Sequence, residues 1–325
     1  MHKLTPTEWI WRDGTFIRWA DAQIHVLSHS VQFGSAPFEG IRCYETPNGP
    51  AVFRLRDHLR RLLGSCKIYR IEMTYSLDEL TAACCELVER NGMETCYLRP
   101  TVIRGYGAAG MVPTASPVEV YLACWPWSAY LGDGALDAGV DVCVSTWNRV
   151  APNTLPSMAK MAGNYLSGML VKMEALADGY AEAIALDSNG LVSEGSGQNV
   201  FVIKDGTIHT APINGSLLHG ITRDTVLTLA QEAGIPVREG PVPRELLYLA
   251  DEVFFCGTAV EVVPVRSVDK IAVGSGRPGA MTLDIQRRFM DLVHGRTPDP
   301  RGWLSYVRGV PERRFARAAT ESGNG

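Results

Sequence analysis

Hydrophobic and polar residues alternate along this chain with two different periods, so both helices and strands are expected. Apolar residues recur with helical spacing over residues 56–69, which predicts an amphipathic helix. Ser76 followed by Glu79 has the spacing of a capping box, and it predicts a second helix over residues 76–91. By the same criteria we expect helices over residues 161–176, 222–232, 244–249 and 281–294.

Runs of β-branched and aromatic residues bounded by turn residues predict the strands. Strands and helices are mixed without strict alternation, which favours an α+β fold over a doubly wound parallel sheet. The predicted strands lie at residues 9–16, 50–55, 95–104, 118–125, 140–147, 181–187, 199–204 and 252–256.

A Trp- and Gly-rich connection, WPWSAYLGDGALDAG, separates the predicted elements into two groups. We therefore expect a small α/β domain over residues 1–128, an interdomain loop over residues 129–139 and a large domain over residues 140–308. Residues 309–325 are polar and are expected to form a disordered tail.

The composition excludes several classes of protein. The chain has 325 residues, of which 46% are hydrophobic and 20% are charged, and its net charge is −4. Because there is no basic excess, no nucleic-acid partner is expected, and no apolar run is long enough to cross a bilayer. The N-terminus lacks the layout of a signal peptide, and the eight cysteines form no CxxC pair, so a cytosolic protein with reduced core thiols is expected.

Two motif-like patterns are not given a function. Residues 274–279 match GxGxxG, but Pro278 removes a backbone N–H and too little chain follows to complete a dinucleotide-binding unit. His25 and His29 are four residues apart, as zinc ligands on a helix can be. Their segment is too rich in β-forming residues to be a secure helix, so no metal site is expected.

Lys160 is the first candidate for chemistry, because no acidic residue lies near it in the stretch PSMAKMAGNYLSG. One interpretation is a surface lysine whose methylene groups rest on Met158 and Met161. The other is a lysine in a confined site, where desolvation lowers its pKa and allows it to form a Schiff base with an aldehyde cofactor. The stretch alone does not decide between them.

Three other stretches offer the groups that one such cofactor, pyridoxal phosphate, requires. Its pyridine nitrogen needs a carboxylate, its ring oxygen needs a donor, and its phosphate needs N–H groups, hydroxyls and a cation. Glu194 offers a carboxylate, Thr222 begins a helix after a Gly-Ile-Thr turn, and Thr258 directly follows a buried strand. Each residue alone has an ordinary structural explanation, such as a solvated turn acid or an N-cap. Together they predict one site.

Long stretches distributed over nearly the whole chain are specific enough to identify a family. They are FEGIRCY, the run Phe-Arg…His-Leu-Arg-Arg-Leu within residues 53–62, YLRP, WNRVAPNTLPSMAKMAGNYL, SEGSGQN, HGITRD, LYLADEVFFCGTA and RGWLSYV. In these stretches the chain resembles the fold-type IV pyridoxal-phosphate aminotransferases, and among them the bacterial branched-chain amino acid aminotransferases. The resemblance extends from about Trp9 to Val307 and implies that residues 140–308 form the PLP-binding domain.

The resemblance implies a role in cofactor binding for each matching residue. Lys160 corresponds to the Schiff-base lysine, and it is also the implied catalytic residue, because that lysine carries the proton between the substrate Cα and the cofactor C4′. Glu194 corresponds to the partner of the pyridine nitrogen, and Tyr165 to the donor to the ring oxygen. The implied phosphate contacts are Arg61, Ile221, Thr222 and Thr258.

The resemblance also implies a substrate site that accepts both aliphatic and acidic substrates. Arg99 and Tyr130 resemble the groups that receive the distal carboxylate of glutamate. The implied α-carboxylate site is Tyr97 with the amides of Thr258 and Ala259, and the implied walls of the aliphatic pocket are Phe38, Trp127 and Tyr165.

Three departures from the family pattern affect the expected substrate range. The family often has tyrosine in place of Phe33 and glutamate in place of Gln198, and the loop RGYGAAGMVP differs from its usual Gly- and Val-rich form. That loop helps to close the substrate pocket, so cofactor chemistry is better determined than substrate choice.

The implied function is ping-pong transfer of an amino group between leucine, isoleucine or valine and 2-oxoglutarate. The implied assembly is a homodimer or a higher homo-oligomer, with loops of one subunit completing the site of the other. Two alternatives on the same fold stay open. One is an R-selective amine or D-amino-acid transaminase, against which Tyr97 and Arg99 argue, and the other is an aminodeoxychorismate lyase.

Overall fold

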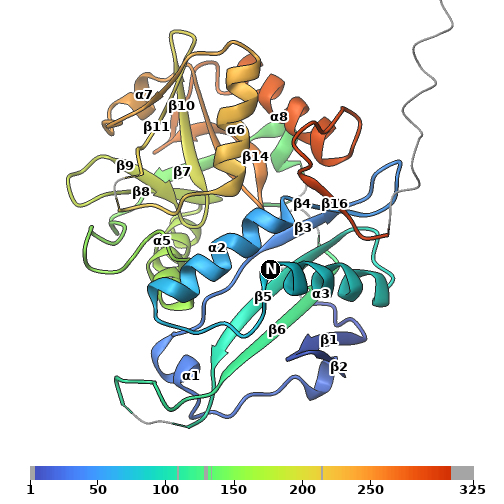
Figure 1. Cartoon of the computed structure of the whole chain (residues 1–325). Coiled ribbons are helices and arrows are strands. Elements are labelled where there is room, and N and C mark those ends of the chain that lie inside the picture. Colours follow the sequence, from blue (N-terminus) through green and yellow to red (C-terminus); the bar gives the residue numbers. More distant parts are fainter. Residues whose placement is uncertain (1–3, 108–109, 128–130, 133, 214, 309–325) are drawn as a thin grey trace, which may run out of the picture.

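The described part of the chain forms two β-sheets flanked by helices (Figure 1). The computed structural model describes residues 4–107, 110–127, 131–132, 134–213 and 215–308. The mixture of helices and strands confirms the expected α+β class. No helix within these ranges is both long and apolar enough to span a membrane.

The first sheet is antiparallel and comes mainly from the N-terminal part of the chain. Its described strands follow the order β16-β4-β3-β5-β6-β1-β2. Because β16 pairs with β4, the last described strand returns to the sheet in which the chain begins. The strands are β1 (Trp9–Arg12), β2 (Thr15–Arg18), β3 (Ile41–Tyr44), β4 (Ala51–Phe53), β5 (Cys96–Arg104), β6 (Val118–Trp125) and β16 (Leu304–Tyr306).

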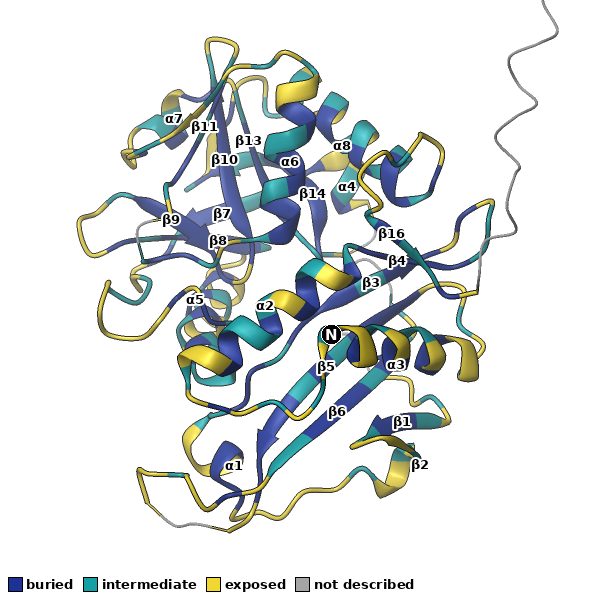
Figure 2. Ribbon diagram, viewed as in Figure 1, coloured by how far each residue is buried: buried dark blue, intermediate teal, exposed yellow. Residues whose placement is uncertain are grey.

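Helices α2 (Leu55–Ile68) and α3 (Leu77–Arg90) pack against the first sheet, and their outer sides are exposed (Figure 2). Their apolar sides share one core with β5, as the periodicity predicted. The expected capping box is present, because Ser76 Oγ accepts a hydrogen bond from the N–H of Glu79 (3.2 Å) while the Glu79 carboxylate accepts one from the N–H of Ser76 (2.7 Å).

The second sheet curls until two of its strands meet beside the candidate site. Its order is β12-β11-β10-β13-β14-β7-β8-β9, and β9 also pairs with β10. In that closing pair Glu194 of β9 lies opposite Asn199 of β10. The strands are β7 (Val140–Val144), β8 (Glu182–Leu186), β9 (Val192–Gly195), β10 (Asn199–Lys204), β11 (Thr207–Thr210), β12 (Val237–Glu239), β13 (Glu252–Gly257), β14 (Glu261–Val268) and β15 (Ile271–Ala272).

The other described helices are short or lie around the second sheet (Figure 1). Helix α6 runs beside β13, and α8 packs against both α6 and β14. They are α1 (His29–Phe33), α4 (Ala135–Ala138), α5 (Tyr165–Ala177), α6 (Ile221–Glu232), α7 (Leu246–Leu249) and α8 (Ala280–Val293). The predicted domain boundaries remain a prediction.

Several predicted elements differ from the observed ones; the segment predicted as a strand over residues 9–16, for example, is divided by a turn between β1 and β2. Two other elements differ in their ends. The helix predicted over residues 161–176 begins at Tyr165, because Met161 pairs with Pro37 in an isolated bridge and residues 162–164 form a 3-10 turn. The strand predicted over residues 140–147 ends at Val144. Both changes arise where the chain meets a segment distant in sequence, which local periodicity does not register.

Candidate active site

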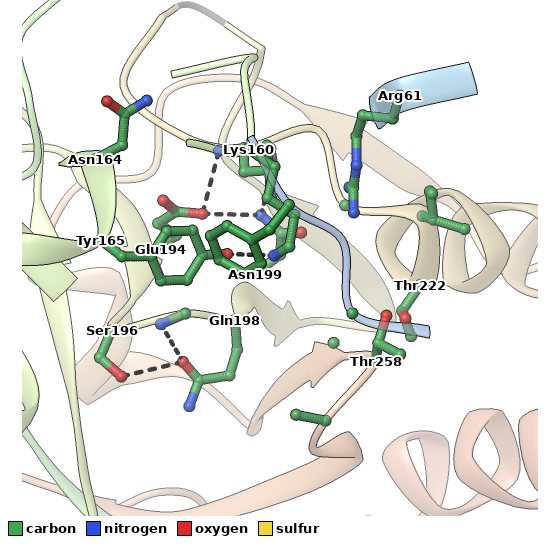
Figure 3. Close-up of a pocket in the computed structure, with 18 of the residues that line it drawn as sticks. Arg61, Lys160, Asn164, Tyr165, Glu194, Ser196, Gln198, Asn199, Thr222 and Thr258 are labelled. Atoms are coloured by element: carbon green, nitrogen blue, oxygen red, sulfur yellow. Dashed lines mark hydrogen bonds between the residues drawn. The ribbon is translucent and has the colours of Figure 1, made fainter. Parts of the chain in front are cut away.

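A cavity of about 530 Å³ brings together every described residue that the sequence suggested for the site. Its walls come from both sheets and from α2, α5 and α6 (Figure 3). Tyr130, one of the residues suggested for the distal carboxylate, lies outside the described residues. The lining includes Phe38, Arg61, Tyr97, Arg99, Trp127, Lys160, Tyr165, Glu194, Ile221, Thr222, Thr258 and Ala259.

The backbone of Lys160 is held by α2 and by the segment that precedes β3. Its N–H donates to Ser65 Oγ on α2 (3.0 Å), and its carbonyl accepts from the N–H of Phe38 (3.0 Å). Asn164 clamps the preceding loop, because its Nδ2 donates to the carbonyls of Pro156 (3.0 Å) and Ala159 (3.1 Å). These bonds hold the start of the lysine side chain in one place, as a reacting group requires.

The side chain of Lys160 points into the cavity, and its Nζ donates to the hydroxyl of Tyr165 (Figure 3). Burial, reinforced by the nearby charge of Arg61, lowers the pKa of Lys160 to about 8. The structure thus places Lys160 in a confined site, as the second interpretation expected, and its Schiff-base role stays a prediction. Burial also raises the pKa of Tyr165 to about 12, so its hydroxyl keeps its proton at neutral pH.

Glu194 is buried at the point where β9 meets β10, and hydrogen-bond donors surround its carboxylate. Arg149 Nη2 lies 2.7 Å from Oε1, while Oε2 accepts from the N–H of Leu218 (3.2 Å) and from Asn199 Nδ2 (3.4 Å). Burial raises the pKa of Glu194, and Arg149 opposes that rise. Sequence reasoning missed Arg149, although the stretch WNRVAP that contains it was recognised as specific.

Arg61 is held by a buried acidic residue that the sequence reasoning also missed. Its Nε and Nη2 donate to the two carboxylate oxygens of Glu39 (2.7 and 2.8 Å), and its Nη1 donates to the carbonyl of His219 (2.8 Å). His58 Nδ1 lies 2.7 Å from the same carboxylate. Burial alone would raise the pKa of Glu39, but Arg61 and His58 outweigh it and hold this pKa well below its usual range.

Backbone donors gather beside Arg61, at the start of α6 and in the turn after β13. The first N–H groups of a helix have no partner within the helix, and Ile221 and Thr222 occupy these positions in α6. Gly220 must be a glycine, because a Cβ there would lie 2.0 Å from Asn199 Oδ1. Thr258 lies in the second turn, between β13 and β14.

Aromatic rings form the part of the cavity suggested for the substrate. Tyr97 stacks on Trp127 with their centroids 4.4 Å apart, and Phe38 packs edge-on against Tyr165 (5.0 Å). Arg99 lies among these rings, with its guanidinium carbon 4.8 Å from the centroid of Phe38. Its Nε is buried and has no hydrogen-bond partner among the described residues. This part of the cavity is therefore largely aromatic, and the guanidinium of Arg99 lies within it.

Phe33, the first departure, does not line the cavity of its own chain. It is 47% exposed and packs against His29 at the end of α1, with the ring centroids 4.5 Å apart and the ring planes tilted by 32°. His25 and His29 do not share a helix, because α1 begins at His29. Within the described ranges no group of three or more His, Cys, Asp or Glu side chains is arranged to hold a metal ion.

Gln198, the second departure from the family pattern, forms a hydrogen bond with the buried carboxylate of Glu182. Its Nε2 donates to Glu182 Oε2 (2.7 Å), which also lies 3.0 Å from Lys172 Nζ. Its Oε1 accepts from the N–H of Gly197 (2.6 Å). Gln198 is 3% exposed and Glu182 is fully buried, so the amide joins the loop after Glu194 to the core of the second sheet.

Replacing Gln198 with glutamate is expected to destabilise the protein at neutral pH by roughly 2 kcal/mol, because a second buried carboxylate would face Glu182. The pKa of the new carboxyl should be raised in the folded state. The loss should therefore be absent below the ordinary glutamate pKa of about 4.3, should grow as the pH rises from there to the raised value, and should level off above it. Melting temperatures at several pH values measure this, with the exposed Gln231→Glu as control. An equal loss at all pH values would contradict the explanation.

The comparisons with known proteins agree on one family. The family model described as "Amino-transferase class IV" matches residues 36–268. The branched-chain-amino-acid aminotransferase of Escherichia coli K12 is 51% identical over 301 residues, which cover 92% of this chain and 97% of that protein. Proteins of the same kind are also found among solved structures.

Two solved structures are similar over nearly their whole length. The crystal structure of the Escherichia coli branched-chain amino acid aminotransferase has a TM-score of 0.91 and 50% identity, covering 93% of this chain and 100% of that one. The branched-chain amino acid aminotransferase of Thermobaculum terrenum, in its PLP-bound holo-form, has a TM-score of 0.86 and 33% identity, covering 94% of this chain and 99% of that one.

Proposed function

The chain belongs to the class IV aminotransferases, and we propose that it transfers an amino group between leucine, isoleucine or valine and 2-oxoglutarate, with pyridoxal 5'-phosphate as cofactor. The observation that carries this proposal is the desolvated Lys160 in one cavity with Glu194, Arg61 and the start of α6. The relatives named above support the choice of substrates.

The residues of the cavity fit the proposed cofactor. When bound, pyridoxal phosphate withdraws electrons from the substrate Cα into its ring. Glu194 would accept the N–H of the ring, and Tyr165 would donate to the ring oxygen. Arg61, the first N–H groups of α6 and Thr258 would hold the phosphate. Lys160, with a pKa near 8, can accept and return a proton at neutral pH.

The proposed substrate site explains how one pocket accepts two kinds of substrate. Aliphatic side chains would lie against Phe38, Tyr165 and Trp127, where their burial is favourable. The distal carboxylate of glutamate would instead reach Arg99, which lies within the same aromatic walls. Tyr97 and the turn at residues 258–259 would hold the α-carboxylate that both substrates share.

A panel of amino donors with either 2-oxoglutarate or pyruvate as acceptor tests this proposal. We expect the highest kcat/KM for L-leucine, L-isoleucine and L-valine with 2-oxoglutarate. Preference for R-amines or D-amino acids with pyruvate would instead support the first alternative, and release of pyruvate from aminodeoxychorismate would support the second. Either result would reject the proposed substrates without rejecting the proposed cofactor.

We also propose that the protein is cytoplasmic and assembles at least as a homodimer. An exposed apolar stripe on α5 supports a partner surface, because its members follow one another with helical spacing. Phe33 and Val31 of α1 are also exposed. In such a dimer, exposed residues of one copy would help to complete the active site of the other copy. The α5 stripe consists of Leu166, Met169, Leu170, Met173 and Leu176.

Placing two carboxylates in this stripe, as Met169→Glu with Met173→Glu, is expected to convert the assembly to monomers. These side chains are 50% and 59% exposed in the single chain, so the substitutions leave its core intact. Burying unpaired carboxylates at an interface is costly. Light scattering after size-exclusion chromatography gives the mass, with Leu283→Glu on α8 as a matched control. A double variant that stays dimeric would show that α5 is not the interface.

A further inference from the structure

Arg149 and Glu194 form a buried ion pair, and this pair affects whether Glu194 is protonated or charged beside the bound cofactor. The two side chains are only 9% and 4% exposed, and Nη2 and Oε1 are 2.7 Å apart. The N–H of Arg149 donates to the carbonyl of Leu186 on β8 (2.8 Å), so the backbone that carries the guanidinium is fixed to the second sheet.

Among the described residues, Glu194 is the acidic side chain that pairs with the buried guanidinium of Arg149. Its Nε and Nη1 are buried and have no hydrogen-bond partner among the described residues. Helix α5 presses close to it, because a Cβ on Gly168 would lie 3.4 Å from Nη1. Burying a cation destabilises the folded state unless an opposite charge lies beside it. The carboxylate of Glu194 supplies that opposite charge.

The other groups around Glu194 do not replace Arg149. Leu218 and Asn199 donate neutral hydrogen bonds to Oε2. Lys160 also favours the charged carboxylate, but more weakly than Arg149, while Tyr165 is neutral and carries its own proton. Each of these contacts is one in which the carboxylate accepts a hydrogen bond, as a charged Glu194 requires.

We propose that Arg149 is a positioning residue that places the shared proton of the hydrogen bond between Glu194 and the cofactor on the ring nitrogen. The proton of that bond can reside on the carboxyl or on the nitrogen. By stabilising the carboxylate from its far side, Arg149 makes Glu194 the weaker base of the two. The ring then carries the positive charge that makes it an electron acceptor. This inference rests on the proposed cofactor.

The test reads the ring nitrogen directly in the loaded enzyme, with pyridoxal phosphate labelled with ¹⁵N in the ring. The ¹⁵N chemical shift separates a protonated from a neutral ring at each pH. We expect a protonated ring in the natural protein at neutral pH and a neutral ring in Arg149→Met. The ring should be neutral because the shared proton moves to Glu194, whose carboxyl pKa rises by about one to three units without the opposite charge. Single-turnover removal of the Cα proton should slow at least tenfold.

Two further variants separate this role from a structural one. Arg149→Lys keeps a charge at a greater distance, so its ¹⁵N chemical shift at neutral pH should lie between those of the natural protein and Arg149→Met. Arg42→Met is the matched control, because Arg42 forms another mostly buried pair, with Glu261 (2.9 Å), and should leave the ring-nitrogen titration unchanged.

A protonated ring in Arg149→Met with an unchanged titration would overturn the proposal, even if the melting temperature fell. If Arg149→Met does not take up the cofactor, the titration of Arg149→Lys decides, and a curve identical to that of the natural protein overturns the proposal. If the natural protein itself binds no pyridoxal phosphate, the proposed function fails instead, so the two failures are distinguishable.

Discussion

Lys160→Ala is expected to abolish turnover, with a loss of at least about 10³-fold in kcat from the missing proton carrier and covalent attachment. The expectation rests on the desolvated amine, whose pKa is lowered to about 8, and on the bonds that fix its backbone to Ser65 and Phe38. The noncovalent contacts of the cavity remain in the variant. The cofactor should therefore still bind, but more weakly and without a link to the protein.

Borohydride reduction followed by peptide mass spectrometry measures this result. The natural protein should carry the cofactor on the peptide containing Lys160, and the variant should carry none. Lys67→Ala on the exposed side of α2 is the control and should behave as the natural protein. Labelling of another lysine in the natural protein, or an active Lys160→Ala, would reject the assignment.

Glu194→Gln is expected to slow removal of the Cα proton by roughly 10- to 100-fold while the cofactor stays bound. A hydrogen bond between a carboxylate and the protonated ring is worth about 1.5–3 kcal/mol, and the amide cannot hold the ring in its charged form. The substitution also leaves the buried Arg149 without its anionic partner, so the melting temperature should fall. Asn199 and the N–H of Leu218 can still bond to the amide oxygen.

Single-turnover kinetics with α-deuterated and ordinary leucine measure the proton-removal step. A control is Glu45→Gln, which changes an exposed acid outside the cavity and should leave the rate unchanged. An unchanged single-turnover rate in Glu194→Gln would show that the ring nitrogen does not meet this carboxylate.

Local sequence determined most of the secondary structure. The capping box at Ser76, the helix over residues 222–232 and the strand over residues 199–204 all follow from spacing within a few residues. The predicted ends were wrong where a segment distant in sequence forms hydrogen bonds with the chain. Met161, for example, pairs with Pro37 instead of starting a helix. Tertiary hydrogen bonds decide such ends, and they leave no periodic pattern.

The sequence also named most members of the site, because most of them belong to long family-specific stretches. It did not determine their charge states or their partners. The lowered pKa of Lys160 depends on its burial beside Arg61, ninety-nine positions earlier in the chain. The partnership of Glu39 with Arg61 and of Arg149 with Glu194 likewise joins separate elements. Desolvation and Coulomb interactions depend on burial and on distances through space, so only the tertiary structure decided them.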